Sequence, residues 1–100
     1  MKDAKSCKTI EEVRQEIDRI DREVMELLAK RQDYVCEIIR FKKDEESIVA
    51  QGRQDQLYQQ RRQWAEELRL SPEMIEEVYK TMVRHNIQKE LELHKQTKNS

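Results

Sequence analysis

The sequence contains few of the residues that form turns, sheets and disulfides. Its 100 residues include one Gly, one Pro, two Cys and five aromatic residues. A sheet needs many turn formers together with β-branched and aromatic residues, so this composition favours an all-α protein. Cys7 and Cys36 lie far apart and do not have the spacing of metal ligands, so we expect reduced thiols and no metal site.

Long apolar runs are also absent. No stretch approaches the roughly 18 apolar residues of a membrane span. The N-terminal residues lack the apolar run of a signal peptide, so we expect a cytoplasmic protein. Twenty basic residues oppose 21 acidic ones, which leaves a net charge of −1. This balance predicts no general attraction to nucleic acid or to anionic membranes. The length predicts one domain, residues 1–100, with an ordered core over about 9–95.

A long first helix is predicted over residues 9–43, which contain no Gly or Pro. Thr9 and Glu12 have the spacing of a capping box at its start. The apolar residues recur at gaps of three and four, at positions 10, 13, 17, 20, 24, 27, 28, 35, 38 and 39. Such a helix is roughly 50 Å long, more than the width of a 100-residue globule. It therefore favours an intertwined homodimer, in which a second chain covers the apolar face.

Two further helices are predicted, which makes three per chain. Residues 44–52 break the periodicity and are predicted to form a loop that closes over a site. The second helix covers about 53–68, with Leu57, Trp64, Ala65 and Leu68 on its apolar side and Arg61 or Tyr58 at the missing turn. Ser71 as N-cap and Pro72 in the first turn open a third helix that extends to about residue 95.

Cations interrupt the apolar faces of these helices. Arg31 stands where the face of the first helix needs an apolar residue, and Lys42, Arg14 and Arg53 stand near the same faces or at a helix start. A buried cation is costly unless an anion meets it. The four cations therefore indicate a site for a small anion, although each alone is as well explained by a snorkelling side chain or a surface ion pair. No Ser–His–Asp or Cys–His arrangement can be read from the sequence.

Several of these residues form a longer pattern. It consists of Arg14-x-x-Ile17-Asp18-x-Ile20-Asp21, then Arg31, Lys42 and Arg53. The pattern resembles the all-helical chorismate mutase family, over about residues 7–95. Within that family the match is closest to the isochorismate pyruvate-lyases. The residues that carry this closer match are Asp33-Tyr34-Val35, Arg40-Phe41-Lys42 and Trp64-Ala65-Glu66-Glu67.

The resemblance implies an intertwined all-α homodimer with two equivalent sites for a small dicarboxylate substrate. Arg14, arriving from the other chain, and Arg31 would clamp the substrate carboxylates. Lys42 would hydrogen-bond the ether oxygen and a carboxylate, and Arg53 would close the site from the loop side. Glu90, which many bacterial members replace by Gln, would lie beside the ether oxygen opposite Lys42.

The resemblance also assigns residues around the substrate ring. Gln54 would hold the ring hydroxyl and Asn86 would assist a carboxylate. The apolar wall of the ring would be formed by Val35, Ile38, Leu57, Val83 and Ile87.

Three functions remain open at this point. The first is a chorismate mutase, which rearranges chorismate to prephenate without a cofactor. The second is an isochorismate pyruvate-lyase, which forms salicylate and pyruvate, and one protein could do both. The third is a non-catalytic helical dimerisation module. The presence of all four cations argues against the third, because a scaffold does not need them.

Overall fold

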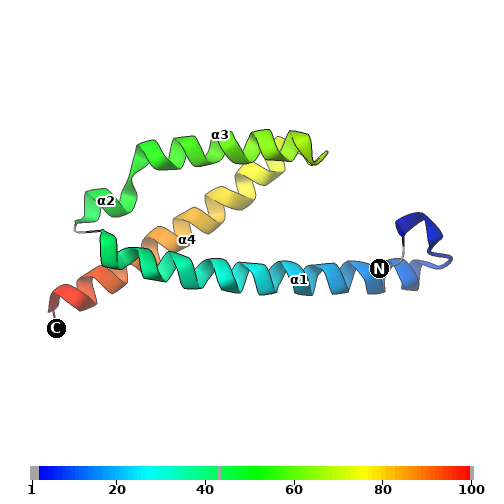
Figure 1. Ribbon diagram of the computed structural model, residues 1–100, viewed down its shortest axis with the longest axis horizontal. Helices are drawn as coiled ribbons and strands as arrows, with labels where there is room; N and C mark the ends of the chain where they lie inside the picture. Colours follow the sequence, from blue (N-terminus) through cyan, green and yellow to red (C-terminus); the bar gives the residue numbers. More distant parts are fainter. Residues whose placement is uncertain (1–2, 43, 100) are drawn as a thin grey trace. The chain divides into compact units, whose positions relative to one another are not determined.

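The computed structural model describes residues 3–42 and 44–99, which form helices and no strand. The prediction of an all-α fold is confirmed for these residues. The elements, in chain order, are η1 (Ala4–Ser6), α1 (Ile10–Glu37), η2 (Ile38–Phe41), α2 (Glu45–Val49), α3 (Gln51–Glu67) and α4 (Pro72–Asn99), as shown in Figure 1. Within the described residues, none of the helices combines the length and apolar character needed to span a membrane.

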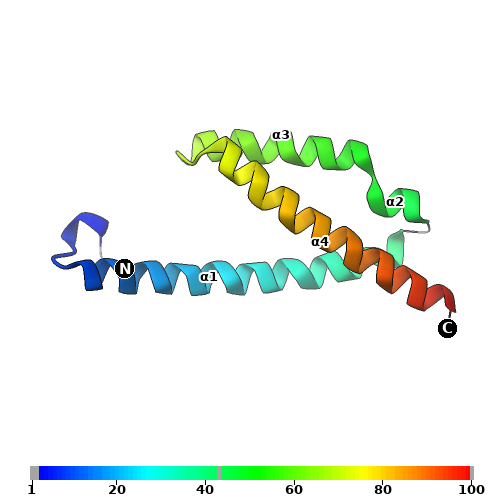
Figure 2. The same cartoon turned by 180° about the vertical axis from the view of Figure 1, so that it is seen from behind.

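The chain divides into two compact units, Met1–Tyr34 and Val35–Ser100. The first unit consists mainly of α1, which is one continuous helix in both views (Figures 1 and 2). The second unit contains the last residues of α1 together with η2, α2, α3 and α4.

The start of α1 has the predicted cap in a modified form. The backbone N–H of Glu12 donates to Thr9 Oγ1 at 3.1 Å, as a capping box requires. The Glu12 carboxylate, however, accepts from the N–H of Lys8 at 2.8 Å rather than from that of Thr9. The helix therefore begins where the sequence predicts, but the hydrogen bond to the Glu12 carboxylate comes from the residue before the N-cap.

The end of α1 comes earlier than predicted. The α-helix ends at Glu37, and Ile38–Phe41 form the 3-10 helix η2. A tighter 3-10 turn commonly closes an α-helix. The backbone of Lys42 is then extended, with φ −99° and ψ 121°. The prediction of one helix to residue 43 is therefore wrong over residues 38–42, and its last residue lies outside the described residues. This change of direction carries Lys42 off the helix.

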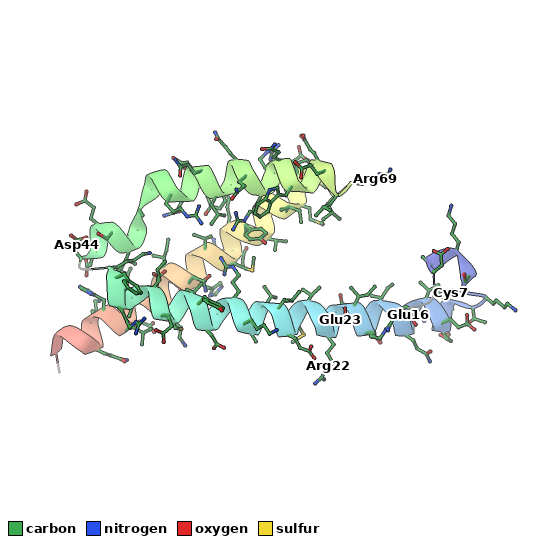
Figure 3. All side chains as sticks on the ribbon, viewed as in Figure 1. Cys7, Glu16, Arg22, Glu23, Asp44 and Arg69 are labelled. Carbon is green, nitrogen blue, oxygen red and sulfur yellow. The ribbon has the colours of Figure 1, made fainter. Side chains whose placement is uncertain are left out.

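Surface ion pairs cover part of α1. Arg19 pairs with Glu16, and Arg22 pairs with Glu26 at 3.3 Å. Figure 3 shows Arg22 pointing away from the helix axis. None of the residues of α1 is buried, including its regularly spaced apolar residues.

Helices α3 and α4 form an antiparallel hairpin that meets at one end and diverges toward the other (Figures 1 and 2). The turn is a Schellman motif, because Leu70 N–H donates to Ala65 O at 2.8 Å and Arg69 N–H donates to Glu66 O at 3.2 Å. Arg69, labelled in Figure 3, takes the left-handed position with φ 62°. Ser71 Oγ then accepts from Met74 N–H at 3.2 Å, which confirms the predicted N-cap of α4.

The buried part of α3 is narrower than its predicted apolar side. Leu57 and Ala65 are buried, whereas Trp64 and Leu68 are exposed in the single chain. Arg61 occupies the turn between Leu57 and Ala65. Its guanidinium lies over the rings of Trp64 and Tyr79, at 4.6 and 5.3 Å from their centres. A cation–π contact of this kind replaces apolar packing at that turn.

The segment predicted to be a loop contains the short helix α2. The Asp44 carboxylate caps it by accepting from Ser47 N–H at 2.7 Å. This backbone hydrogen bond lowers the pKa of Asp44, so the cap is present at neutral pH and is lost only as the pH falls through the lowered pKa. At the other end, Ile48 is 1% exposed and α2 contacts α4.

We predict that Ile48 stabilises the second unit through its side chain. Ile48→Ala should lower the free energy of unfolding by about 2–5 kcal/mol, because it removes fully buried methyl and methylene groups. Val49→Ala is the matched control, since the adjacent Val49 side chain is exposed. Urea unfolding followed by circular dichroism measures both. Equal unfolding free energies for the two variants would show that α2 is not part of the core.

Candidate functional site

The site is built around the ammonium group of Lys42. Lys42 Nζ lies 3.0 Å from Glu90 Oε1 on α4 and donates to the backbone carbonyl of Ile48 on α2 at 3.5 Å. The Lys42 side chain is 20% exposed and that of Glu90 is 6% exposed. Three segments of the second unit therefore converge on one cation.

The burial of this pair determines its electrostatics. Removing a carboxylate from water is costly, and a cation at hydrogen-bond distance offsets that cost. Removal of the Lys42 ammonium would leave the Glu90 carboxylate buried and uncompensated. The structure thus brings together the two residues that the resemblance placed on opposite sides of a substrate oxygen.

Glu90 lies on the buried face of α4. Val83, Asn86 and Glu90 are buried and follow each other at spacings of three and four, which places them on one side of the helix. Of the predicted apolar wall, Leu57 and Val83 are buried, Val35 and Ile87 are half-buried, and Ile38 is exposed.

The first turn of α3 holds Arg53 and Gln54. Arg53 is exposed. Gln54 Nε2 donates to the carbonyl of Val49 at 2.6 Å, so one of its two N–H donors is used by the backbone of α2. The predicted contact of Gln54 with a ring hydroxyl remains a prediction.

The sequence did not reveal the part that α2 plays. The backbone carbonyls of Ile48 and Val49 each accept from a side chain, and a backbone carbonyl has no sequence signature. Helix α2 did have a sequence signature, because Asp44 followed by Glu45 and Glu46 is a typical N-cap with an acidic first turn.

Arg14 and Arg31 belong to the first unit. Arg14 Nη1 lies 4.0 Å from Glu11 Oε1, and both side chains are largely exposed. Arg31 is half-buried on α1. The roles of both arginines as carboxylate clamps stay predictions.

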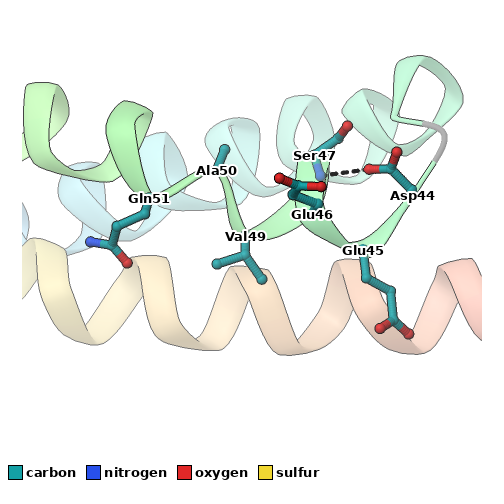
Figure 4. A pocket seen from close by; sticks show the side chains of 7 residues that line it. All are labelled: Asp44, Glu45, Glu46, Ser47, Val49, Ala50 and Gln51. Carbon is teal, nitrogen blue, oxygen red and sulfur yellow. Dashed lines mark hydrogen bonds between the residues drawn. The ribbon is translucent and has the colours of Figure 1, made fainter.

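An open pocket beside α2 has the wrong charge for an anion. Figure 4 shows the carboxylates of Asp44, Glu45 and Glu46 around it. Its lining consists of Asp44, Glu45, Glu46, Ser47, Val49, Ala50 and Gln51. Three carboxylates repel a dicarboxylate, so the candidate site for an anion is at Lys42 and not in this pocket.

The arrangement at Lys42 suits an oxygen that gains negative charge. An ammonium has three donors and no acceptor, and it stabilises such an oxygen most where water is excluded. Glu90 accepts from Lys42 when ionised and can donate a hydrogen bond when protonated. The pair can therefore contact one substrate oxygen from two sides.

Comparison with known proteins gives two findings. Residues 13–91 match the family described as chorismate mutase type II. The chain is also 32% identical to isochorismate pyruvate lyase of Pseudomonas aeruginosa over 98 residues, which are 98% of this chain and 97% of that protein. The matched segment includes both Lys42 and Glu90. The chain belongs to the chorismate mutase type II family of enzymes.

Proposed function

We propose that the protein converts chorismate to prephenate by a pericyclic rearrangement that needs no cofactor. The observation that carries this proposal is the ammonium of Lys42, held 3.0 Å from a buried carboxyl group. Chorismate carries two carboxylates and an enolpyruvyl ether. Membership of the family supports chorismate-related catalysis by this site.

The rearrangement breaks the C–O bond of the ether, and negative charge grows on the ether oxygen as the bond lengthens. A preorganised ammonium stabilises that charge more in the transition state than in the ground state. Lys42 is positioned before the substrate arrives by Glu90 and by the Ile48 carbonyl. No nucleophile is needed, because the bonds rearrange within one molecule.

The two carboxylates of the substrate require cationic partners. In our proposal Arg31 and Arg14 form bidentate contacts with them and hold the compact conformer in which the reacting carbons meet. Arg14 arrives from the second chain of an intertwined homodimer. The exposed apolar residues of α1, among them Ile17 and Val24, support a dimer because water would otherwise cover them.

A second candidate is the elimination of pyruvate from isochorismate, which forms salicylate. Its support is the relative named isochorismate pyruvate lyase, which aligns over almost the whole chain. The two substrates share the carboxylates and the ether and differ mainly in the position of a hydroxyl group. The deciding experiment supplies chorismate and isochorismate separately and identifies prephenate, or salicylate with pyruvate. If neither compound is converted, both proposals are wrong and the non-catalytic module is supported.

The first prediction from this proposal concerns assembly. The protein should sediment as a dimer of about twice 12.2 kDa, with a midpoint of unfolding that rises with protein concentration. Ile17→Asp combined with Val24→Asp should shift the population toward monomer and abolish activity, because charges replace apolar residues on α1. The exposed Glu23, on the same helix, provides the control Glu23→Gln. A compact, active monomer at micromolar concentration would contradict the shared site.

A further prediction separates a carboxylate clamp from a snorkelling side chain at Arg31. Arg31→Ala should lower kcat/KM by at least about 100-fold while the helical circular dichroism is retained. Lys42→Ala should lower kcat more than it weakens substrate binding, because the charge on the ether oxygen develops late. Arg22→Ala is the matched control, since Arg22 is an exposed arginine of α1 paired with Glu26. Turnover within about twofold of normal in the Arg31 and Lys42 variants would refute these roles.

The last prediction here concerns the hydrogen bond that residue 90 offers to the substrate. The ether oxygen accepts hydrogen bonds, and an ionised carboxylate has none to donate, whereas an amide donates and also accepts. Glu90→Gln should therefore preserve or raise kcat/KM near pH 7, because its amide both accepts from Lys42 and donates to the substrate. The exposed Glu92 supplies the control, and Glu92→Gln should leave kcat/KM unchanged. An inactive Glu90→Gln variant would exclude residue 90 as the donor.

A further inference from the structure

The short helix α2 depends on side chains for its stability. It has five residues, far fewer than an isolated helix needs. The last carbonyl groups of any helix lack partners within the helix. In α2, Glu46 O accepts from Ala50 N–H at 2.9 Å. The last two carbonyls, those of Ile48 and Val49, accept from the side chains of Lys42 and Gln54.

The connection between α2 and α3 is a strained turn. Ala50 is both the C-cap of α2 and the N-cap of α3, with φ 40° and ψ 64°. An L-residue with a Cβ atom disfavours this left-handed region, which glycine adopts without penalty. Gln54 reaches back across the turn from α3 and donates to Val49 O at 2.6 Å. The amide therefore closes the turn from the α3 side.

The Gln54 contact is coupled to Lys42 through two consecutive peptide groups. The Ile48 carbonyl belongs to the peptide plane directly before the one that contains the Val49 carbonyl. Fixing the second plane restricts the first, because only the two dihedrals of Val49 separate them. The buried Ile48 side chain anchors the same point of α2. The Ile48 carbonyl is thus held in the place where it accepts from Lys42 Nζ.

We propose that Gln54 is a positioning residue of the site: it fixes the end of α2, so that the Ile48 carbonyl and Glu90 together orient the Lys42 ammonium. This inference rests on the proposed function for its kinetic consequences. It differs from a direct role in substrate recognition, because it assigns the function of Gln54 to the contact that holds its amide against the Val49 carbonyl of α2.

The kinetic test compares Gln54→Met with Gln51→Met. Both substitutions replace an amide by an apolar side chain of similar length in the first turn of α3. Gln51 Nε2 donates to the exposed Asp55 Oδ1 at 3.1 Å, outside the contacts of Lys42. We expect Gln54→Met to lower kcat by about 10- to 100-fold, with a smaller change in KM, because Lys42 loses its alignment. Gln51→Met should behave as the unaltered protein.

The pattern across substrates distinguishes positioning from recognition. A positioning residue lowers the rates with chorismate and isochorismate by the same factor, and Ala50→Gly added to Gln54→Met should restore part of kcat, because glycine relaxes the turn. A residue that binds the ring hydroxyl would change the ratio of the two rates, raise KM and gain nothing from Ala50→Gly. Either this second pattern or normal kcat in Gln54→Met would overturn the proposal.

A second measurement does not depend on turnover. Hydrogen exchange at the amides of Ile48 and Ala50, which close the turns of α2, should become faster in Gln54→Met and stay unchanged in Gln51→Met. If the unaltered protein converts neither substrate, the proposed function fails, and the exchange rates alone decide whether Gln54 holds α2. Equal exchange in the two variants would refute that role.

Discussion

The buried ion pair between Lys42 and Glu90 is the contact on which the second unit depends. The two residues are 48 positions apart, and Lys42 Nζ lies 3.0 Å from Glu90 Oε1 with the carboxylate almost fully removed from water. The Lys42 ammonium offsets the cost of burying the Glu90 carboxylate. The exit of the chain from η2 and the docking of α4 must therefore be correct at the same time, which couples folding of this unit to assembly of the site.

The helix α2 links this ion pair to the turn that follows it. Its last carbonyls accept from Lys42 and Gln54, its Ile48 side chain is buried, and its start is capped by Asp44. A five-residue helix has little stability of its own. Its geometry is consequently set by the groups that also form the site, so that a change in α2 reaches the Lys42 ammonium directly.

Helix α2 has both acidic side chains and a cation beside it. The open pocket lined by Asp44, Glu45 and Glu46 repels anions, whereas the Ile48 carbonyl accepts from a cation. Membership of the chorismate mutase type II family supports chorismate-related catalysis. In our proposal, catalysis depends on the positions of fixed charges and not on a covalent bond between protein and substrate.

Much of the fold could be predicted from local sequence. The scarcity of Gly and Pro and the spacing of apolar residues predicted the all-α class, and Thr9 and Ser71 marked the starts of α1 and α4. Helix caps and the spacing of apolar residues depend on neighbouring residues, so they can be read from the sequence alone. The early end of α1, the helix α2 and the exposure of Trp64 escaped prediction, because packing against other segments decided them.

The sequence by itself determined which residues are candidates for the site. It placed cations where apolar residues were expected, and the pattern from Arg14 to Arg53 indicated the family. Only the tertiary structure decided that Lys42 meets Glu90, that the Ile48 carbonyl completes the contacts of the ammonium, and that Gln54 is engaged by the Val49 carbonyl. The physical reason is that these contacts join residues on different elements or involve backbone carbonyls, which every residue carries and no sequence pattern distinguishes.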